Sequence, residues 1–367
     1  MATLQLSDPH QSIKEDGTTA VRCPLWRQVQ EEARNMMKDE PALARYFRMT
    51  LLTYDTMERA LAYHLACKLG NDSVSMETWD ELLADVLEAH TDHLGVFFRA
   101  DLVAILTRDP AAEGPAHAFL NFKGYLGLQA SRIGHVLWKE DRKSLALAIQ
   151  SRVSEVFGMD IHPGCQVGAG VMIDHATGVV FGETAVVGDN CTFLHGVTLG
   201  GTGKSRGDRH PKLGCGILVG AGSMILGNIS VGDGCKVAAG SVVLRNLPAQ
   251  VVAAGVPAKI IGTATEGKPS ETVDQNLKHV RYHSMIGNGN GKQNGKNGGS
   301  GTGRAGAPED SRTDPRRETL GMRGIEPRSA ASCDKWQKSL SFFLPSGVQC
   351  VAVVCGIVSH NICHQTQ

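Results

Sequence analysis

The first long pattern in the chain is helical. Between residues 23 and 156, apolar residues recur at three- and four-residue intervals, as in WRQVQEEARNMMKDE and YDTMERALAYHLACKL. Ser73 and Ser75 are candidate N-caps, and Pro41 and Pro110 lie at expected helix starts or breaks. The pattern predicts roughly five to eight helices packed as a bundle over this region.

Over residues 157–265 the apolar period changes to six. One series runs unbroken and a second follows out of register: Ile161, Val167, Ile173, Val179, Ala185, Cys191 and Val197, then Leu213, Val219, Ile225, Val231, Val237 and Val243. This period fits neither a helix nor an ordinary strand. It is typical of a parallel β-helix, in which each hexad forms one short side of a triangular coil. We therefore expect residues about 18 apart to stack.

The two series are separated by a basic segment, Gly203–Lys212. Its charged residues are mostly cations, with a single acid among them: Lys204, Arg206, Arg209, His210 and Lys212 against Asp208. A break in the period of a solenoid predicts a loop that leaves one corner, and loops of this kind frequently carry function. A solvated surface loop is the alternative.

The two ends of the chain lack these patterns. We predict a flexible extension over residues 1–22 and a tail over residues 266–367 that includes the low-complexity segment GNGNGKQNGKNGGSGTG. Lys plus Arg and Asp plus Glu both number 37, so charge favours neither nucleic acid nor a membrane as partner. The ten cysteines include no CxxC pair, which favours a reducing compartment. We expect a cytoplasmic protein, with an organelle left open.

A histidine beside acidic residues is the first candidate for chemistry. The segment IDHATG supplies Asp174 and His175, and Asp160 lies fifteen residues before His175. That offset is three short of the expected coil, so Asp160 can lie one turn below His175 near a shared corner. A carboxylate there would fix the tautomer of a general base and stabilise its imidazolium. A satisfied corner histidine and a turn-capping aspartate are the alternative, and spacing does not choose between them.

At this point the chain resembles a known family. MDIHPGCQVGAG, IDHATGVVFGETAVVG, VTLGGTGKSRGDRHPK and AAGVPAKIIG are similar, in order and separation, to motifs of the hexapeptide-repeat serine acetyltransferases. The resemblance covers roughly Cys23 to Ile261 and includes LTRDP in the helical region. It implies an α+β fold: an N-terminal α-helical bundle, a left-handed parallel β-helix of hexapeptide repeats and a low-complexity C-terminal tail.

The resemblance also implies an activity. Acetyl-CoA would be the co-substrate, and its acetyl group would pass to the hydroxyl of L-serine at the start of cysteine synthesis. His175 would be the general base and Asp160 its orienting carboxylate. We expect direct attack in a ternary complex, without an acyl-enzyme or a metal, because nothing in these motifs pairs a nucleophile with a base as covalent catalysis would need.

Further residues are assigned by the same resemblance to the two substrates. Arg209 and His210 would hold the serine carboxylate and close the site, while Asp109 of LTRDP and Asp174 would receive the ammonium group. Each end of the zwitterion would then meet opposite charge, leaving the hydroxyl to face the base. Coenzyme A would lie along small corner residues in a groove between subunits, with a lysine on a phosphate: Gly201, Ala221, Ala239 and Lys259.

The family also implies partners. We expect a homotrimer or a dimer of trimers, with L-cysteine as a feedback inhibitor in the serine pocket. Family members often bind O-acetylserine sulfhydrylase through a tail ending in isoleucine. This chain ends at Gln367, far beyond the solenoid, so we do not expect that complex unless the tail is processed.

Three alternatives stay open on sequence grounds. The first is a hexapeptide acyltransferase with a sugar, an antibiotic or an amine as acceptor. The second is a zinc hydrolase related to the γ-carbonic anhydrases, using histidines from His162, His175, His195 and His210. The third is a structural or regulatory partner without activity of its own.

Overall fold

The computed structural model describes residues 23–203, 206–264 and 269–273. The helices are α1 (Pro24–Asp39), α2 (Ala44–Phe47), α3 (Met57–Leu69), α4 (Met76–Ala89), α5 (Thr91–Arg108), α6 (Pro115–Asn121), α7 (Lys123–Lys139), α8 (Lys143–Phe157) and α9 (Pro269–Thr272), with short turns η1 (Pro41–Leu43) and η2 (Arg48–Leu52). Among these residues no helix is both long and apolar enough to cross a membrane. The predicted extension over residues 1–22 and nearly all of the predicted tail lie outside the described residues.

Local chemistry explains where the helices begin. Ser75 caps α4, its hydroxyl accepting from the backbone N–H of Thr78, as predicted. Ser73 does not cap a helix; its backbone N–H instead donates to the side chain of Asn71 in the turn before α4. Pro41 opens η1, where a missing N–H costs nothing. Helix α5 ends where Asp109, its C-terminal cap, turns to extended backbone.

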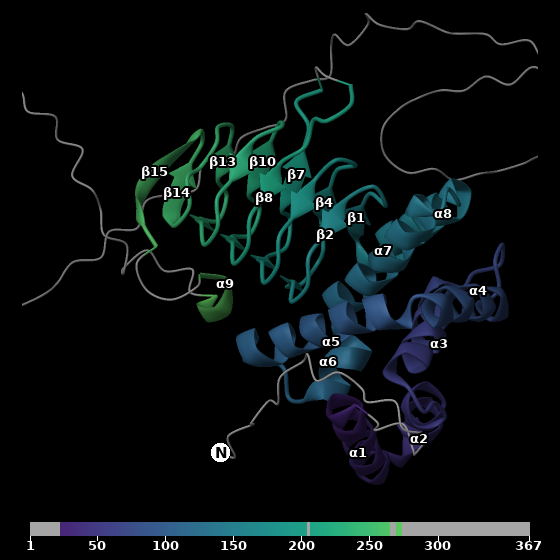
Figure 1. Ribbon diagram of the computed structural model, residues 1–367. Coiled ribbons are helices and arrows are strands. Elements are labelled where there is room, and N and C mark those ends of the chain that lie inside the picture. The colour runs from purple at the N-terminus through teal and green to yellow at the C-terminus, as the bar shows by residue number, and fades with distance from the viewer. Residues whose placement is uncertain (1–22, 204–205, 265–268, 274–367) are drawn as a thin grey trace, which may run out of the picture. The chain divides into compact units, whose positions relative to one another are not determined.

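The strands form three parallel ladders that make the sides of a triangular coil (Figure 1). Their bounds are β1 (Met159–Ile161), β2 (Gln166–Val167), β3 (Met172–Ile173), β4 (Val179–Phe181), β5 (Val186–Val187), β6 (Thr192–Phe193), β7 (Thr198–Gly200), β8 (Lys212–Leu213), β9 (Leu218–Val219), β10 (Met224–Leu226), β11 (Ser230–Val231), β12 (Lys236–Val237), β13 (Val242–Val243), β14 (Val251–Gly255) and β15 (Ala258–Thr263). We call β1-β4-β7-β10-β13 sheet A, β2-β5-β8-β11 sheet B, and β3-β6-β9-β12-β14-β15 sheet C. Only β15 runs antiparallel, in a closing hairpin with β14. The predicted helical bundle followed by a parallel β-helix is confirmed.

Two corners of the coil flank sheet A, and both matter for function. The C–A corner, where the chain passes from sheet C to sheet A, comprises residues 174–178, 194–197, 220–223 and 238–241. The A–B corner comprises residues 162–165, 182–185, 201–211 and 227–229, of which 204 and 205 are not described. The predicted excursion at Gly203–Lys212 lies at this corner, between β7 and β8, and lengthens the β5-to-β8 offset to 26 residues.

The predicted register is wrong between Ile173 and the loop at Gly203–Lys212, whereas the second series, from Leu213 to Val243, stacks at 18 residues as predicted. Ile161 pairs with Phe181 and Ile173 with Phe193, an offset of 20 residues where 18 was expected. The two extra residues lie between β3 and β4, in the turn that carries the IDHATG motif. Val179, Ala185, Cys191 and Val197 of the predicted series are indeed buried, but they precede the strand residues that stack, which are Phe181, Val187, Phe193 and Leu199. The next offset on sheet A, from Phe181 to Leu199, returns to 18.

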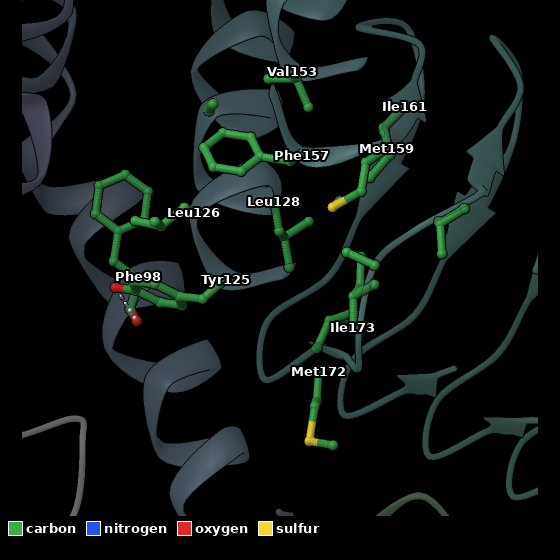
Figure 2. Close-up of a cluster of buried hydrophobic side chains, with 14 of the residues drawn as sticks. Phe98, Tyr125, Leu126, Leu128, Val153, Phe157, Met159, Ile161, Met172 and Ile173 are labelled. Atoms are coloured by element: carbon green, nitrogen blue, oxygen red, sulfur yellow. Dashed lines mark hydrogen bonds between the residues drawn. The ribbon is translucent and has the colours of Figure 1, made fainter. Parts of the chain in front are cut away.

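Helices α5, α7 and α8 pack directly on the first coil. Figure 2 shows Phe98, Leu128 and Phe157 from these helices gathered against Met159 and Ile173 of the solenoid. Burial of large apolar side chains on both sides makes the helical region and the first coil one continuous core.

A buried ion pair also joins the two regions. Asp101 on α5 and Arg132 on α7 are 2.9 Å apart, with side chains 0% and 6% exposed. Arg132 donates onward to the carbonyls of Val167 and Gly168, and Asp101 accepts from the backbone N–H of Val171. These onward contacts tie α5 and α7 to β2 and to the corner between sheets B and C.

Candidate functional site

The C–A corner gathers two acids and two histidines. His175 and Ala176 adopt left-handed backbone, with φ of 56° and 57°, in the turn that holds the two extra residues. This turn pushes the His175 side chain outward, so that it is 72% exposed. The His195 ring lies edge-on to it, with centroids 5.7 Å apart. Asp174 Oδ2 is 3.6 Å from His175 Nε2.

Electrostatics at this corner favour a positively charged guest. Burial raises the pKa of Asp174; His175 lowers it, and the charge of Asp109 raises it again. A carboxylate whose ionisation is disfavoured by burial and by a like charge is stabilised when a cation binds beside it. An ammonium group is such a cation.

Helix α5 brings Asp109 to this corner. Its carboxylate accepts from the N–H of Ala111 at 2.8 Å, which turns the chain at the end of the helix. The preceding residue, Arg108, donates to the carbonyl of Cys191 and the hydroxyl of Thr192, both on the second coil. The end of the helix is therefore fixed to the solenoid next to Asp109.

The A–B corner holds the other predicted substrate residues. Arg209 makes an ion pair with Glu183 at 2.8 Å. His210 is 6% exposed, and its ring rests where a Cβ on Gly182 would lie. Burial, with the neighbouring charge of Arg209, lowers the pKa of His210. A neutral imidazole beside a guanidinium provides hydrogen-bond donors suited to a carboxylate.

Asp160 does not meet His175 within one chain. It lies on β1 in sheet A, where its carboxylate accepts from Gln150 Nε2 on α8 at 2.6 Å. The prediction that Asp160 lies one turn below His175 rested on an 18-residue coil, and the first coil has 20. Within the described chain, the carboxylate recorded against the His175 ring belongs to Asp174.

The candidate residues therefore form two groups on opposite edges of sheet A. The edges are separated by the width of β4, three residues or roughly 10 Å at 3.3 Å per residue. The coenzyme candidates divide in the same way. Ala221 and Ala239 stack at the C–A corner, where Ala221 lies directly above His195, while Gly201 is at the A–B corner. Lys259 is exposed in the β14–β15 hairpin.

Known proteins share both the sequence and these motifs. Residues 25–130 match the family described as "Serine acetyltransferase, N-terminal", and residues 210–245 match "Bacterial transferase hexapeptide (six repeats)". Serine acetyltransferase 4 of Arabidopsis thaliana is 46% identical over 281 residues, which span 75% of this chain and 79% of the relative. Serine acetyltransferase of Escherichia coli K12 is 43% identical over 265 residues, 72% of this chain and 97% of the relative.

The chain belongs to the serine acetyltransferase family. Solved structures of serine acetyltransferases share its fold. The Brucella abortus protein in complex with coenzyme A has a TM-score of 0.65 and 45% identity, covering 67% of this chain and 98% of that one. The soybean protein complexed with serine has a TM-score of 0.63 and 48% identity, covering 65% and 97%. A serine acetyltransferase complex with cysteine has a TM-score of 0.67 and 42% identity, covering 69% and 98%.

The histidines of this serine acetyltransferase do not converge as a zinc site would require. His162 and His210 belong to the A–B corner, whereas His175 and His195 belong to the C–A corner. Among the described residues no three His, Cys, Asp or Glu side chains are placed to share a metal ion.

Sequence reasoning missed two residues that contact the candidate groups and named a third, His195, only as a candidate zinc ligand. Glu183 pairs with Arg209, Thr184 binds both Arg209 and His210, and His195 faces His175. Glu183 and Thr184 follow Gly182 in the VVFGETAVVG segment, but nothing in a hexad pattern links them to a loop 26 residues later. His195 had a usable signal, because it lies 20 residues after His175, which is the true length of the first coil.

Proposed function

We propose that this protein acetylates the hydroxyl of L-serine with acetyl-CoA, using His175 as the general base. The observation that carries the proposal is the pair of complementary groups on the two edges of sheet A: acids and an exposed imidazole at one edge, Arg209 and His210 at the other. Relatives solved with coenzyme A, with serine and with cysteine support the same substrates and inhibitor.

The proposed chemistry is a single displacement. Asp109 and Asp174 receive the serine ammonium group, so that the hydroxyl faces the His175 ring. The imidazole takes the hydroxyl proton as the serine oxygen attacks the thioester carbonyl, and the tetrahedral intermediate forms. The carbon–sulfur bond then breaks, and the imidazolium returns the proton to the departing coenzyme A sulfur. O-acetylserine and coenzyme A are the products.

One chain cannot supply both ends of this site, so we propose that two copies share it. When the C–A corner of one copy meets the A–B corner of the next, His175 faces Asp160, Arg209 and His210 of its neighbour. The contact joins two different surfaces, and such a contact closes into a ring when the rotation permits. A trimer with sheet A facing the axis satisfies this requirement, and two trimers joined through the helical regions would give the hexamer.

Co-expression of two differently tagged variants tests the shared site. His175→Ala should lower kcat by about 10²–10⁴-fold, the usual cost of losing a general base. Arg209→Ala should chiefly raise KM for serine. In each mixed trimer one of the three sites combines an intact His175 with an intact Arg209 from the neighbour, so activity should recover to about a third. No recovery in purified mixed oligomers would place the whole site within one chain and overturn the shared arrangement.

An acceptor panel tests the substrate. With acetyl-CoA, L-serine should be acetylated well above sugars, polyamines and aminoglycosides. Turnover of another acceptor with inert serine would overturn the proposal. Mass spectrometry after acetyl-CoA alone should find no acetylated enzyme; a stoichiometric adduct would replace the direct transfer with a covalent route.

Several finer features remain part of the proposal. L-cysteine should compete with serine, since it shares the ammonium and carboxylate groups. Lys259 and the small corner residues should contact coenzyme A. The expectation that no complex forms with O-acetylserine sulfhydrylase unless the tail is processed stays a prediction, because Gln367 lies outside the described residues. The expected cytoplasmic location also stays a prediction, since one Arabidopsis relative is named as chloroplastic.

A further inference from the structure

Thr184 is the residue on which the two proposed carboxylate-binding groups converge. Its hydroxyl oxygen accepts from the backbone N–H of Arg209 at 3.0 Å and from that of His210 at 3.1 Å. The same oxygen is 2.9 Å from Nδ1 of the His210 ring. One side chain therefore contacts two consecutive residues of a loop that follows it by about 25 positions.

The ring of His210 is held from two further directions. The backbone N–H of Thr184 donates to Nδ1 at 3.1 Å, so this nitrogen carries a lone pair and the neutral ring bears its proton on Nε2. Beneath the ring lies Gly182, where an added Cβ would be 2.1 Å from Nε2 and Cδ2. Any larger side chain there would displace the imidazole.

The base of the loop is fastened to the same residue. Lys212 Nζ donates to the Thr184 carbonyl at 2.9 Å and pairs with Asp208 at 2.5 Å. Residues 208–212 thus have contacts to Thr184 at both the hydroxyl and the carbonyl. These interactions are local to the A–B corner and touch no residue of the C–A group.

We propose that Thr184, with Gly182 beneath the ring, is a positioning residue that fixes Arg209 and His210 in the geometry needed to recognise the serine carboxylate. This inference rests on the proposed function. In this proposal Thr184 does not contact the substrate itself; it acts by orienting Arg209 and His210, which do.

Serine and L-serinamide, compared as acceptors, test the proposal. Serinamide keeps the ammonium and hydroxyl groups but lacks the carboxylate charge. Thr184→Val retains the shape of the side chain and removes only its hydroxyl. It should lower kcat/KM for serine about 10-fold or more, because hydrogen bonds that orient charged recognition are lost, while kcat/KM for serinamide changes by less than about twofold. The loss should fall mainly on KM.

Two further variants make the result specific. Thr184→Ser restores the hydroxyl and should return the preference for serine to within about threefold of wild type. Gly182→Ala displaces the ring without touching Thr184 and should lower the preference as Thr184→Val does. Thr53→Val is the matched control, since the Thr53 hydroxyl bonds only to the Arg48 carbonyl in the helical region. The kinetic constants of Thr53→Val should equal those of wild type, and the melting temperatures of all the variants should agree with that of Thr53→Val within a few degrees.

The outcomes separate this inference from the proposed function. If Arg209→Ala loses the preference for serine and Thr184→Val keeps it, the positioning role is wrong and the function stands. Equal losses with serine and serinamide in Thr184→Val would show general damage and would also overturn the positioning role. If the wild-type protein does not acetylate serine at all, the proposed function fails, and the inference fails with it.

Discussion

The helical region and the solenoid achieve order in different ways. The helical core is built from large side chains that follow no repeat along the chain. Among them are Trp26, Trp79 and Phe119, all at most 1% exposed. The solenoid repeats small units whose backbones nearly touch: a Cβ on Gly188 would lie 2.6 Å from the backbone of Gly214 in the next coil. One region depends on side-chain shape and buried polar contacts, the other on the spacing of its coils.

The candidate site lies where each region departs from its own rule. In the solenoid, His175 lies in the turn with two extra residues, and Arg209 lies in the long excursion between β7 and β8. In the helical region, Asp109 lies where α5 stops. Regular packing supplies the frame, and the irregular segments carry the polar side chains, as expected of functional loops on rigid elements.

The largest effect should come from breaking the buried ion pair between the regions. Arg132→Met leaves the carboxylate of Asp101 buried without its partner, a loss that typically costs about 3–5 kcal/mol. Urea unfolding at fixed protomer concentration measures it. The unfolding free energy should partly recover in Asp101→Leu/Arg132→Met, which removes both charges.

A second pair provides the control for that experiment. Arg59 and Asp80 join α3 to α4 at 2.6 Å, but their side chains are 38% and 19% exposed. Arg59→Met should therefore cost about 1 kcal/mol or less, because water screens the remaining charge. Equal losses in Arg59→Met and Arg132→Met would mean that burial does not distinguish the two ion pairs as argued.

The helical region should also be the part that fails first in acid. Burial lowers the pKa of His64 to about 4 from 6.5, and its Nε2 is 3.1 Å from the Leu120 carbonyl. Between pH 6.5 and 4 the unfolded chain therefore binds a proton on His64 that the folded chain does not bind. The stability is complete above pH 6.5 and falls as the pH drops toward 4, by roughly 3 kcal/mol in all.

Circular dichroism melts across this range, with His64→Phe beside wild type, measure that effect. The ring of His64 already stacks on Phe119, so an aromatic replacement fits the site, although it leaves the Leu120 carbonyl without its partner. The variant should be less stable at pH 7 and should lose less stability between pH 6.5 and 4. An identical pH dependence in both proteins would remove His64 as the cause.

The sequence could predict this architecture but not the detailed register of the coil. Six-residue periodicity identified the solenoid, and its break identified the loop at Gly203–Lys212. The two extra residues after Ile173 could not be detected from the apolar pattern, because each hexad has two positions that point into the core. Val179 and Phe181 are both buried, so the wrong series still looked apolar. The relation of His175 to Asp160 depended on that register and on a second copy, which one chain's pattern does not encode.

A smaller effect should separate spacing from backbone conformation within the solenoid. Gly188→Ala pushes a methyl group into the next coil and should cost about 3 kcal/mol, the upper end for overpacking, because backbone atoms yield little. Gly216 lies at the same corner with φ of +68°, and an added Cβ there would lie 3.9 Å from its nearest neighbour, Ser270 Oγ, which is an ordinary contact. Gly216→Ala should therefore cost only about 1 kcal/mol. Urea unfolding ranks them. The reverse order would show that turn conformation, not coil spacing, limits this region.

The smallest expected effect tests whether the helical region reaches the chemistry through charge. The charge of Asp109 contributes to the raised pKa of Asp174, and in the proposed site Asp174 receives the serine ammonium group as a carboxylate. As the pH is lowered, serine affinity should therefore begin to weaken at a pH above the ordinary pKa range of an aspartate. Asp109→Asn removes the repulsion, so the pH at which affinity weakens should move lower, by less than about one unit, although affinity falls overall. Calorimetric titration with serine from pH 4 to 7, in a His175→Asn background that removes the imidazole beside Asp174, measures this shift. A midpoint unmoved by Asp109→Asn would mean that α5 contributes a binding group alone and does not tune the acid in the solenoid.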